Sequence, residues 1–225
     1  MLTPPDISIV IPAINEQDTI AACVASAIHA GATEIIVSDG GSDDETAFRA
    51  SQAGASHVIR SIPGRGIQMN CGSTFASGEV VMFLHADNRL APATLSQVCE
   101  LTGDWVWGAA GQRIDDPGFG FRLLEFGNAQ RVRWRAMPFG DQAIFVRRDV
   151  FKQVGGFDEG PLMEDVELSR KLRKIAKPRL IEGPVTVNPR RWKKHGLVKQ
   201  TLLNWRIQIA HKLGVAPETL VTWYR

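Results

Sequence analysis

Continuous apolar runs alternate with amphipathic stretches through the first hundred residues. Runs rich in β-branched residues at 7–11, 35–37 and 80–84 each precede a polar turn and then a stretch with helical periodicity. Strands that are apolar throughout, rather than at alternate positions, are typical of a parallel sheet covered on both faces. The pattern therefore predicts an α/β fold with a Rossmann-like, mostly parallel central sheet and helices on both of its faces.

The second half of the chain is less regular but still mixes both kinds of element. Apolar runs predict strands at 105–112, 142–146 and 180–187. Helical spacing predicts helices at 119–135, 149–154 and 163–176.

The C-terminal stretch predicts an amphipathic helix with a basic character. From Pro189 to the end, Glu218 is the only acid among many lysines and arginines. A basic amphipathic helix either packs on the rest of the protein or lies in a membrane surface. Packing is the commoner reason for such a stripe, so we expect packing. The apolar positions recur at spacings of four, three, four and four: Val198, Leu202, Trp205, Ile209 and Leu213.

Whole-chain composition narrows the class of protein. The 225 residues, of which 44% are hydrophobic, suit one large α/β domain with a small extension. A net charge of +2 gives no argument for a nucleic-acid partner. The three cysteines form no zinc or disulfide spacing. Residues 1–6 lack the pattern of a secretion signal, and no apolar run approaches the roughly 20 residues that cross a bilayer. We expect a cytoplasmic protein, at the inner face of the membrane if the basic stretch touches lipid.

Acidic side chains follow three of the predicted strands. Glu16, Asp39 and Asp87 each stand in the turn after an apolar run. Because the carboxyl ends of parallel strands meet at one edge, where open α/β sheets bind ligands, these acids predict a ligand site. Each turn has a plainer alternative, since Asn15, Glu16 and the acids after Asp39 can simply cap the following helices. No GxGxxG follows the first strand, so the dinucleotide fingerprint is excluded.

Other candidate residues carry charge suited to phosphate, metal or proton transfer. Asp87 suits Mg²⁺ or Mn²⁺, and His85 is either a second ligand or a histidine satisfied within the sheet. Arg65 can meet a phosphate at a helix N-terminus or remain an ordinary solvated arginine. The adjacent Glu164 and Asp165 suit a general base, or else only complement a helix dipole. Two further segments are polar turns of the same kind: Gly140-Asp141-Gln142 and the phosphate-binding candidate Arg190-Arg191-Trp192.

Taken in order, these segments resemble a family 2 glycosyltransferase with the GT-A fold. The segments LHAD and MEDVEL further resemble those of the arsenosugar-biosynthesis subset of such enzymes. The matching pieces are IVIPAINE (9–16), VSDGGSDDET (37–46), GRGIQMN (64–70), FLHAD (83–87), GDQAIFVRRDVFKQVGGFDE (140–159) and MEDVELSRKLRK (163–174).

The resemblance implies a role for each candidate residue. Asp165, beside Glu164, is the implied catalytic base, and Asp87 is the last acid of the family's DxD metal motif. His85 stands where the first acid of that motif is usual, so diphosphate and water must supply much of the metal's coordination. The implied nucleotide-sugar residues are Pro12, Ala13, Asn15, Glu16, Asp39, Gly64, Arg65 and Asp87. The implied acceptor and diphosphate residues are Asp141, Gln142, Arg190, Arg191 and Trp192.

We therefore expect an inverting transfer of a sugar from a nucleotide-diphosphate donor to an acceptor hydroxyl, with Mg²⁺ or Mn²⁺. Residues 1–192 would form the catalytic domain, in which residues 1–100 bind the nucleotide and residues 101–192 form the acceptor and catalytic half. Residues 193–225 would form a helical extension packed on this domain. One alternative is a nucleotidyltransferase, although its usual basic, glycine-rich loop is absent after the first strand. The other is a non-catalytic nucleotide-sugar-binding homologue, against which the intact Asp87 and Asp165 argue.

Overall fold

The computed structural model describes residues 6–224 of the chain. Residues 1–5, which belong to the segment expected to carry no secretion signal, and Arg225 of the basic stretch lie outside the described residues. In the part described, eight strands form one sheet in the order β3-β2-β1-β4-β7-β6-β8-β5. The strands are β1 (Ile7–Ala13), β2 (Glu34–Asp39), β3 (His57–Arg60), β4 (Val80–Phe83), β5 (Arg89–Leu90), β6 (Trp107–Ile114), β7 (Phe145–Arg147) and β8 (Arg179–Val187).

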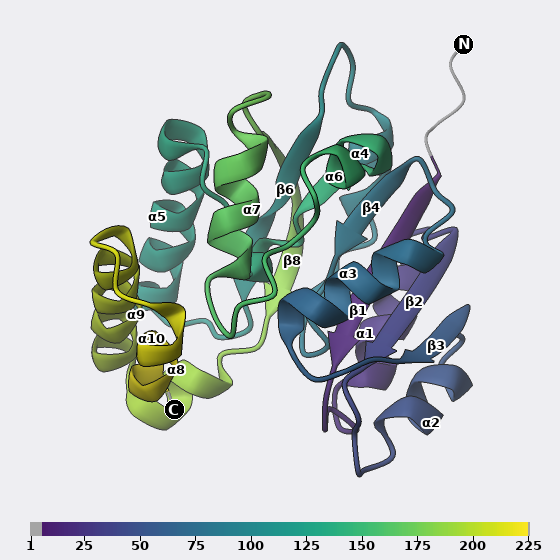
Figure 1. Ribbon diagram of the computed structural model, residues 1–225, viewed down its shortest axis with the longest axis horizontal. Coiled ribbons are helices and arrows are strands. Elements are labelled where there is room, and N and C mark those ends of the chain that lie inside the picture. The colour runs from purple at the N-terminus through teal and green to yellow at the C-terminus, as the bar shows by residue number, and fades with distance from the viewer. Residues whose placement is uncertain (1–5, 225) are drawn as a thin grey trace.

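Helices surround the sheet, and the C-terminal ones gather at the edge that also carries α5 (Figure 1). The helices are α1 (Ile20–His29), α2 (Thr46–Gln52), α3 (Arg65–Phe75), α4 (Thr94–Cys99), α5 (Phe119–Arg135), α6 (Arg148–Gln153), α7 (Glu164–Leu172), α8 (Arg190–His195), α9 (Leu197–Lys212) and α10 (Pro217–Tyr224), with a 3₁₀ turn η1 at Gly140–Gln142.

The sheet is parallel in its first half and mixed in its second. Strands β3, β2, β1 and β4 run parallel, as the apolar runs predicted. Strand β7 is antiparallel to both β4 and β6, whereas β6 and β8 are parallel. The short strand β5 was not predicted and pairs antiparallel with β8. The α/β fold is thus confirmed, with the carboxyl ends of β1, β2 and β4 at one edge.

Alternate residues of the first strands enter two separate cores. Ile9 and Ile11 pack with α1, while Val10 packs on the opposite face with Met69 of α3. The α3 backbone comes so close that a Cβ on Gly72 would stand 2.5 Å from Val10 Cγ1. Burial on both faces explains why these strands are apolar at every position.

The strand predicted at 142–146 is wrong in its first half. Residues 140–142 form the turn η1, Ala143 has a left-handed φ of 45°, and β7 begins only at Phe145. The Gln142 side chain explains the turn, because its Oε1 accepts hydrogen bonds from Arg131 Nη2 at 2.8 Å and from the Phe139 N–H at 3.2 Å.

The apolar stripe of the C-terminal helix is not the face that packs. Its five residues are 55% to 79% exposed, whereas α9 buries Ile207 and Ala210 against Val166 of α7 and Leu220 of α10. The expectation that the stripe makes the packing contact is therefore wrong. Periodicity shows that a helix has two sides, but not which side meets the core. Over residues 6–224, no helix combines the length and apolarity needed to span a bilayer.

Candidate active site

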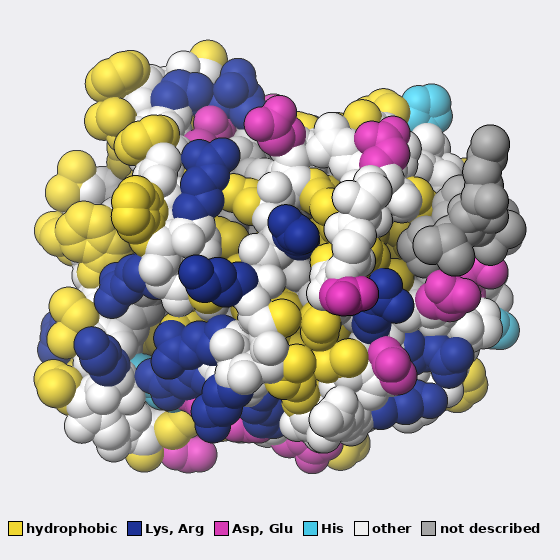
Figure 2. All heavy atoms as spheres, turned by 90° about the horizontal axis from the view of Figure 1, so that it is seen from above, with side chains coloured by type: hydrophobic (Ala, Val, Ile, Leu, Met, Phe, Trp, Pro, Cys, Tyr) yellow, Lys and Arg dark blue, Asp and Glu magenta, His cyan; other side chains and the backbone are white. Residues whose placement is uncertain are grey.

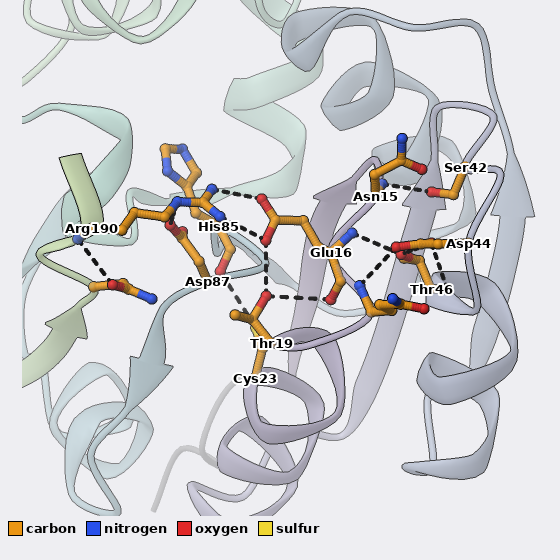
Figure 3. Close-up of polar contacts among 12 residues, drawn as sticks. Asn15, Glu16, Thr19, Cys23, Ser42, Asp44, Thr46, His85, Asp87 and Arg190 are labelled. Atoms are coloured by element: carbon orange, nitrogen blue, oxygen red, sulfur yellow. Dashed lines mark hydrogen bonds and ion pairs between the residues drawn. The ribbon is translucent and has the colours of Figure 1, made fainter. Parts of the chain in front are cut away.

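Two acidic side chains that follow strand ends, Glu16 and Asp87, meet Arg190 of α8 at one edge of the sheet (Figure 3). Arg190 Nη2 lies 2.6 Å from Glu16 Oε1, and Arg190 Nε lies 3.1 Å from Asp87 Oδ2. At the same edge Ala13 of β1 pairs in register with Asp39 of β2. The structure therefore brings together the three strand-end acids that the sequence singled out.

The turns after β1 and β2 hold each other in place. Asn15, with a left-handed φ of 53°, donates its N–H to Ser42 Oγ at 3.0 Å, and Glu16 donates its N–H to Thr46 Oγ1 at 2.8 Å. Asp39 accepts hydrogen bonds from the N–H and the hydroxyl of Ser42 and is only 8% exposed. Each of these groups thus has the plain turn-forming contact as well as its place at the ligand edge.

A buried glutamine that the sequence did not single out fixes this edge. Gln68 of α3 donates through Nε2 to Ala13 O at 2.8 Å and to Ser38 O at 2.9 Å. It is 4% exposed. A Cβ on Gly40 would stand 3.0 Å from the Gln68 amide, so a larger residue there would push this buried amide by a few tenths of an ångström. A glutamine in a helix carries no sequence signal for such a role.

The two acids at the start of α7 have different surroundings. Asp165 lines a cleft whose lining also includes Arg65, Asp87, Asp141 and Trp192. Its Oδ2 accepts the Gly140 N–H at 2.7 Å, and its Oδ1 accepts the Val166 N–H at 2.7 Å. Glu164 is turned inward, 3% exposed, and forms an ion pair with Arg65. Burial raises the pKa of Glu164, while Arg65 opposes that effect. Of the pair, Asp165 is the acid that a substrate can reach.

Gly140 joins the end of β4 to the start of α7. A Cβ at this position would lie 2.8 Å from His85 Nε2 and 3.4 Å from Asp165 Oδ2. Next to it, Asp141 lines the cleft and accepts a hydrogen bond from Gln112 Nε2 at 2.7 Å. Burial raises the pKa of Asp141, and the Arg131 guanidinium opposes the rise. Gln142 instead lies behind the cleft, where it shapes the turn.

Orphaned polar atoms mark the cleft as a place for a polar ligand. Buried polar groups normally have hydrogen-bond partners, so each exception calls for an explanation. Among the described residues, four side chains that line the cleft carry a buried polar atom without a hydrogen-bond partner: His85 Nε2, Asn88 Nδ2, Asp141 Oδ1 and Trp192 Nε1. Both donors and an acceptor are present, as recognition of hydroxyl or phosphate groups requires.

The cleft also includes a wall from α9 that sequence reasoning missed. Gln200, Asn204 and Gln208 stand at every fourth position of this helix, and all line the cleft together with Ile207. This carboxamide row was the available signal, since it lies opposite the apolar stripe. The lining crosses residue 192, so the expected boundary between catalytic domain and extension runs through the site. The predicted residues in the lining are Arg65, Asp87, Asp141, Asp165, Arg190, Arg191 and Trp192.

Several predicted residues lie outside this lining. Pro12, Ala13, Asn15, Glu16 and Asp39 lie along the β1 and β2 end of the same edge, reached from the cleft through Arg190. Gly64 precedes α3 with a φ of 137°, a conformation that favours glycine, and positions Arg65.

A divalent metal fits this edge only as an ion shared with the substrate. Burial raises the pKa of Asp87, and Arg190 opposes the rise. Burial, with Arg65 nearby, lowers the pKa of His85 to about 3, so its imidazole is neutral. In residues 6–224 no group of three His, Cys, Asp or Glu side chains is placed to hold a metal alone. Mg²⁺ often binds one or two protein carboxylates and completes its coordination with phosphate and water. Asp87 can supply a carboxylate once Arg190 leaves it, and the substrate would supply the phosphate.

Comparison with known proteins adds sequence relatives. The family model described as Glycosyl transferase family 2 matches residues 8–155. A PGL/p-HBAD biosynthesis glycosyltransferase of Mycobacterium bovis is 31% identical over 168 residues, covering 68% of this chain and 64% of that protein. An undecaprenyl-phosphate 4-deoxy-4-formamido-L-arabinose transferase of Sodalis glossinidius is 30% identical, covering 63% of this chain and 48% of that protein. The chain thus spans less than two thirds of these relatives.

Solved structures share the fold at lower identity. Glucosyl-3-phosphoglycerate synthase of M. tuberculosis superposes with a TM-score of 0.61 and 22% identity, over 81% of this chain and 71% of that one. The same enzyme has been solved with Mg²⁺ and uridine diphosphate. S. aureus TarS (residues 1–349) gives a TM-score of 0.66 at 17% identity, over 82% and 61%.

Proposed function

The chain belongs to glycosyl transferase family 2, and from that premise we propose that it is a glycosyltransferase that moves a sugar from a nucleoside-diphosphate donor to an acceptor hydroxyl with inversion. The observation that carries this proposal is the position of Asp165, whose carboxylate lines the cleft and is held by the Gly140 N–H. Neither a nucleotidyltransferase nor a non-catalytic nucleotide-sugar-binding homologue would give the Asp165 carboxylate a comparable task.

The donor's base and ribose would lie along the β1 and β2 turns. Asn15, Glu16 and Asp39 end the two adjacent strands there, and the M. tuberculosis synthase of the same fold has been solved with uridine diphosphate. The diphosphate would then extend toward Asp87 and the arginines. Asp39 and Glu16 already have partners in the protein, so nucleotide binding would exchange or share these hydrogen bonds.

Asp165 would act as the general base. Its carboxylate takes the proton of the acceptor hydroxyl as the hydroxyl oxygen attacks the anomeric carbon from the side opposite the diphosphate. The bond from that carbon to the diphosphate oxygen breaks, and the diphosphate leaves with the electron pair. Attack and departure on opposite sides invert the anomeric centre.

Positive charge around the cleft would stabilise the departing diphosphate. Arg65, Arg190 and Arg191 all line it, and fixed charges placed where charge develops lower the barrier. Asp87, with the neutral His85 beside it, would hold Mg²⁺ or Mn²⁺. Such an ion supplies further charge stabilisation at the diphosphate.

The acceptor would bind against α9. The Gln200, Asn204 and Gln208 carboxamides can both donate and accept, which suits an acceptor with several hydroxyl groups. The odd and sparse cysteine count, three in the whole sequence, suits a reducing compartment, so we place the reaction in the cytoplasm.

Product analysis tests this function against the two alternatives. The protein is incubated with a panel of nucleoside-diphosphate sugars, Mn²⁺ and a cell extract as acceptor source, and products are identified by mass spectrometry. We expect release of a nucleoside diphosphate that matches one donor. In a parallel reaction with nucleoside triphosphates and sugar phosphates, release of pyrophosphate would instead indicate a nucleotidyltransferase. Donor binding without any product in either reaction would indicate a non-catalytic homologue.

A further inference from the structure

Exposed hydrophobic side chains concentrate on one edge of the molecule. Figure 2 shows them gathered along the edge that carries α5 and α9 in Figure 1. Of the 15 large hydrophobic side chains exposed among the described residues, nine belong to α5, α9 and the residue after α9. They are Phe119, Leu123, Phe126, Trp134, Val198, Leu202, Trp205, Ile209 and Leu213, here called the α5/α9 apolar face.

These residues are not the margin of the core. Helix α5 buries Phe121 and Val132, and α9 buries Ile207 and Ala210, on the sides away from this face. The face residues themselves reach 83% exposure at Trp134 and 79% at Leu213. On both helices they follow helical spacing. Each helix is therefore apolar on two sides, and one of those sides has no partner in the described chain.

The two stripes adjoin. A Cβ on Gly120 of α5 would stand 2.3 Å from Leu197 Cδ2, the first residue of α9. Face residues Phe119 and Val198 are the chain neighbours of these two contacting residues. The N-terminal ends of the two stripes therefore lie close together, and Figure 2 shows hydrophobic side chains along this edge of the molecule. Large exposed apolar surfaces mark protein or membrane contacts.

The charges beside this face favour an anionic partner. Exposed cations flank it on both helices: Arg133, Arg135, Lys199, Arg206 and Lys212. Helix α9 contains no acid, and Glu125, the acid of α5, is 12% exposed and paired with Arg122. A second copy of this chain would place like charges against each other, whereas a bilayer with anionic headgroups would complement them.

We propose that the α5/α9 apolar face docks in the surface of an anionic phospholipid bilayer. Trp134 and Trp205 suit the headgroup level, where aromatic side chains are enriched, and the aliphatic residues would enter the acyl boundary as in other amphipathic helices. The opposite side of α9 lines the cleft through Asn204 and Gln208. Docking would thus hold the acceptor side of the cleft next to the lipid.

Vesicle sedimentation of the full chain tests this surface without any substrate. The chain is mixed with phosphatidylcholine vesicles, with or without phosphatidylglycerol, and we expect it to pellet with the anionic vesicles and to be released by salt. The double variant Phe126→Ser/Trp205→Ser should lower the bound fraction about tenfold. The control Phe48→Ser removes a similarly exposed side chain, 63% exposed, from α2 and should bind as the wild type does.

Two results would overturn the proposal. One is a wild-type chain that stays in the supernatant with anionic vesicles. The other is a soluble dimer, detected by analytical ultracentrifugation, that the double variant makes monomeric, since the face would then join two copies. Circular dichroism and nucleotide binding by calorimetry show whether each variant is folded. Because vesicle binding is read without donor, its failure leaves the proposed sugar transfer to be judged separately.

Discussion

At the scale of single residues, Arg190 controls the charge of the acidic edge. Its guanidinium bridges Glu16 and Asp87, two acids from different strand ends. A metal ion bound at Asp87 would therefore compete with the Arg190 guanidinium for the same carboxylate. The same arginine lines the cleft and can turn to a bound diphosphate. We infer that substrate and metal enter together, when Arg190 exchanges its carboxylates for phosphate.

Replacing Arg190 should separate these two tasks. In Arg190→Gln, Mn²⁺ should bind several-fold more tightly without nucleotide, because Glu16 and Asp87 lose a competing cation, while turnover falls because the diphosphate loses one. Calorimetry of Mn²⁺ binding and a turnover assay measure the two effects. Arg89→Gln is the matched control, since Arg89 pairs with Asp115, also near a strand end and 2.7 Å away. Unchanged Mn²⁺ affinity in Arg190→Gln would contradict the competition.

At the scale of elements, the site depends on how α3 is tied to the first two strands. Gln68 donates to Ala13 O, the last carbonyl of β1, and to Ser38 O, one residue before the end of β2, and so sets the spacing of their turns. Both contacts are buried, and removing the amide would delete both hydrogen bonds, while Ala13 O would keep the Gly40 N–H at 2.9 Å. Each intramolecular hydrogen bond contributes roughly 0.5–1.5 kcal/mol.

Gln68→Leu should therefore lower the free energy of unfolding by about 1–3 kcal/mol, the sum of two lost hydrogen bonds. It should also weaken nucleotide binding, because the turns that carry Asn15 and Asp39 lose their shared support. Urea unfolding and calorimetry measure the two quantities. Gln52→Leu, at an exposed position of α2, is the control and should change neither. If Gln68→Leu were as stable as the wild type, the tie between α3 and the strand ends would have no energetic weight.

Elements were predictable where their residues follow a regular hydrophobic pattern. The buried strands β1, β2 and β4 and the helix at 119–135 follow directly from apolar runs and periodicity. The turn at 140–142 was not predictable, because a side chain, Gln142, closes it through contacts with distant Arg131. The stripe on α9 was assigned to packing because spacing does not tell a core from a lipid surface.

The sequence predicted which segments contribute to the candidate site, but not which way their side chains point. The sequence located Glu16, Asp39, Asp87 and the acidic pair at α7, since strand ends and helix starts are visible in the pattern. It did not show that Glu164 turns inward to Arg65 while Asp165 faces the cleft. It also missed Gln68, whose role depends on tertiary contacts, and the carboxamides of α9, although their row opposite the apolar stripe is visible in the sequence.

At the scale of the whole molecule, the cleft is assembled from the entire chain. Helix α3 provides Arg65, the turn after β4 provides Asp87, α7 provides Asp165, and α9 closes the acceptor side. The same α9 presents its apolar stripe outward. One helix thus connects the proposed acceptor site with the proposed lipid surface.

Single-turnover release of nucleoside diphosphate by Asp165→Asn, with the donor and acceptor found for the wild type, tests whether the Asp165 carboxylate is the general base. Asparagine keeps an oxygen that can accept the Gly140 N–H but cannot take a proton. We expect unchanged donor binding and a rate about 10²–10⁴-fold lower. The control Asp158→Asn, which removes an acid paired with Lys171, should be as active as the wild type. A folded Asp165→Asn protein that releases the nucleoside diphosphate at the wild-type rate would contradict this role of Asp165.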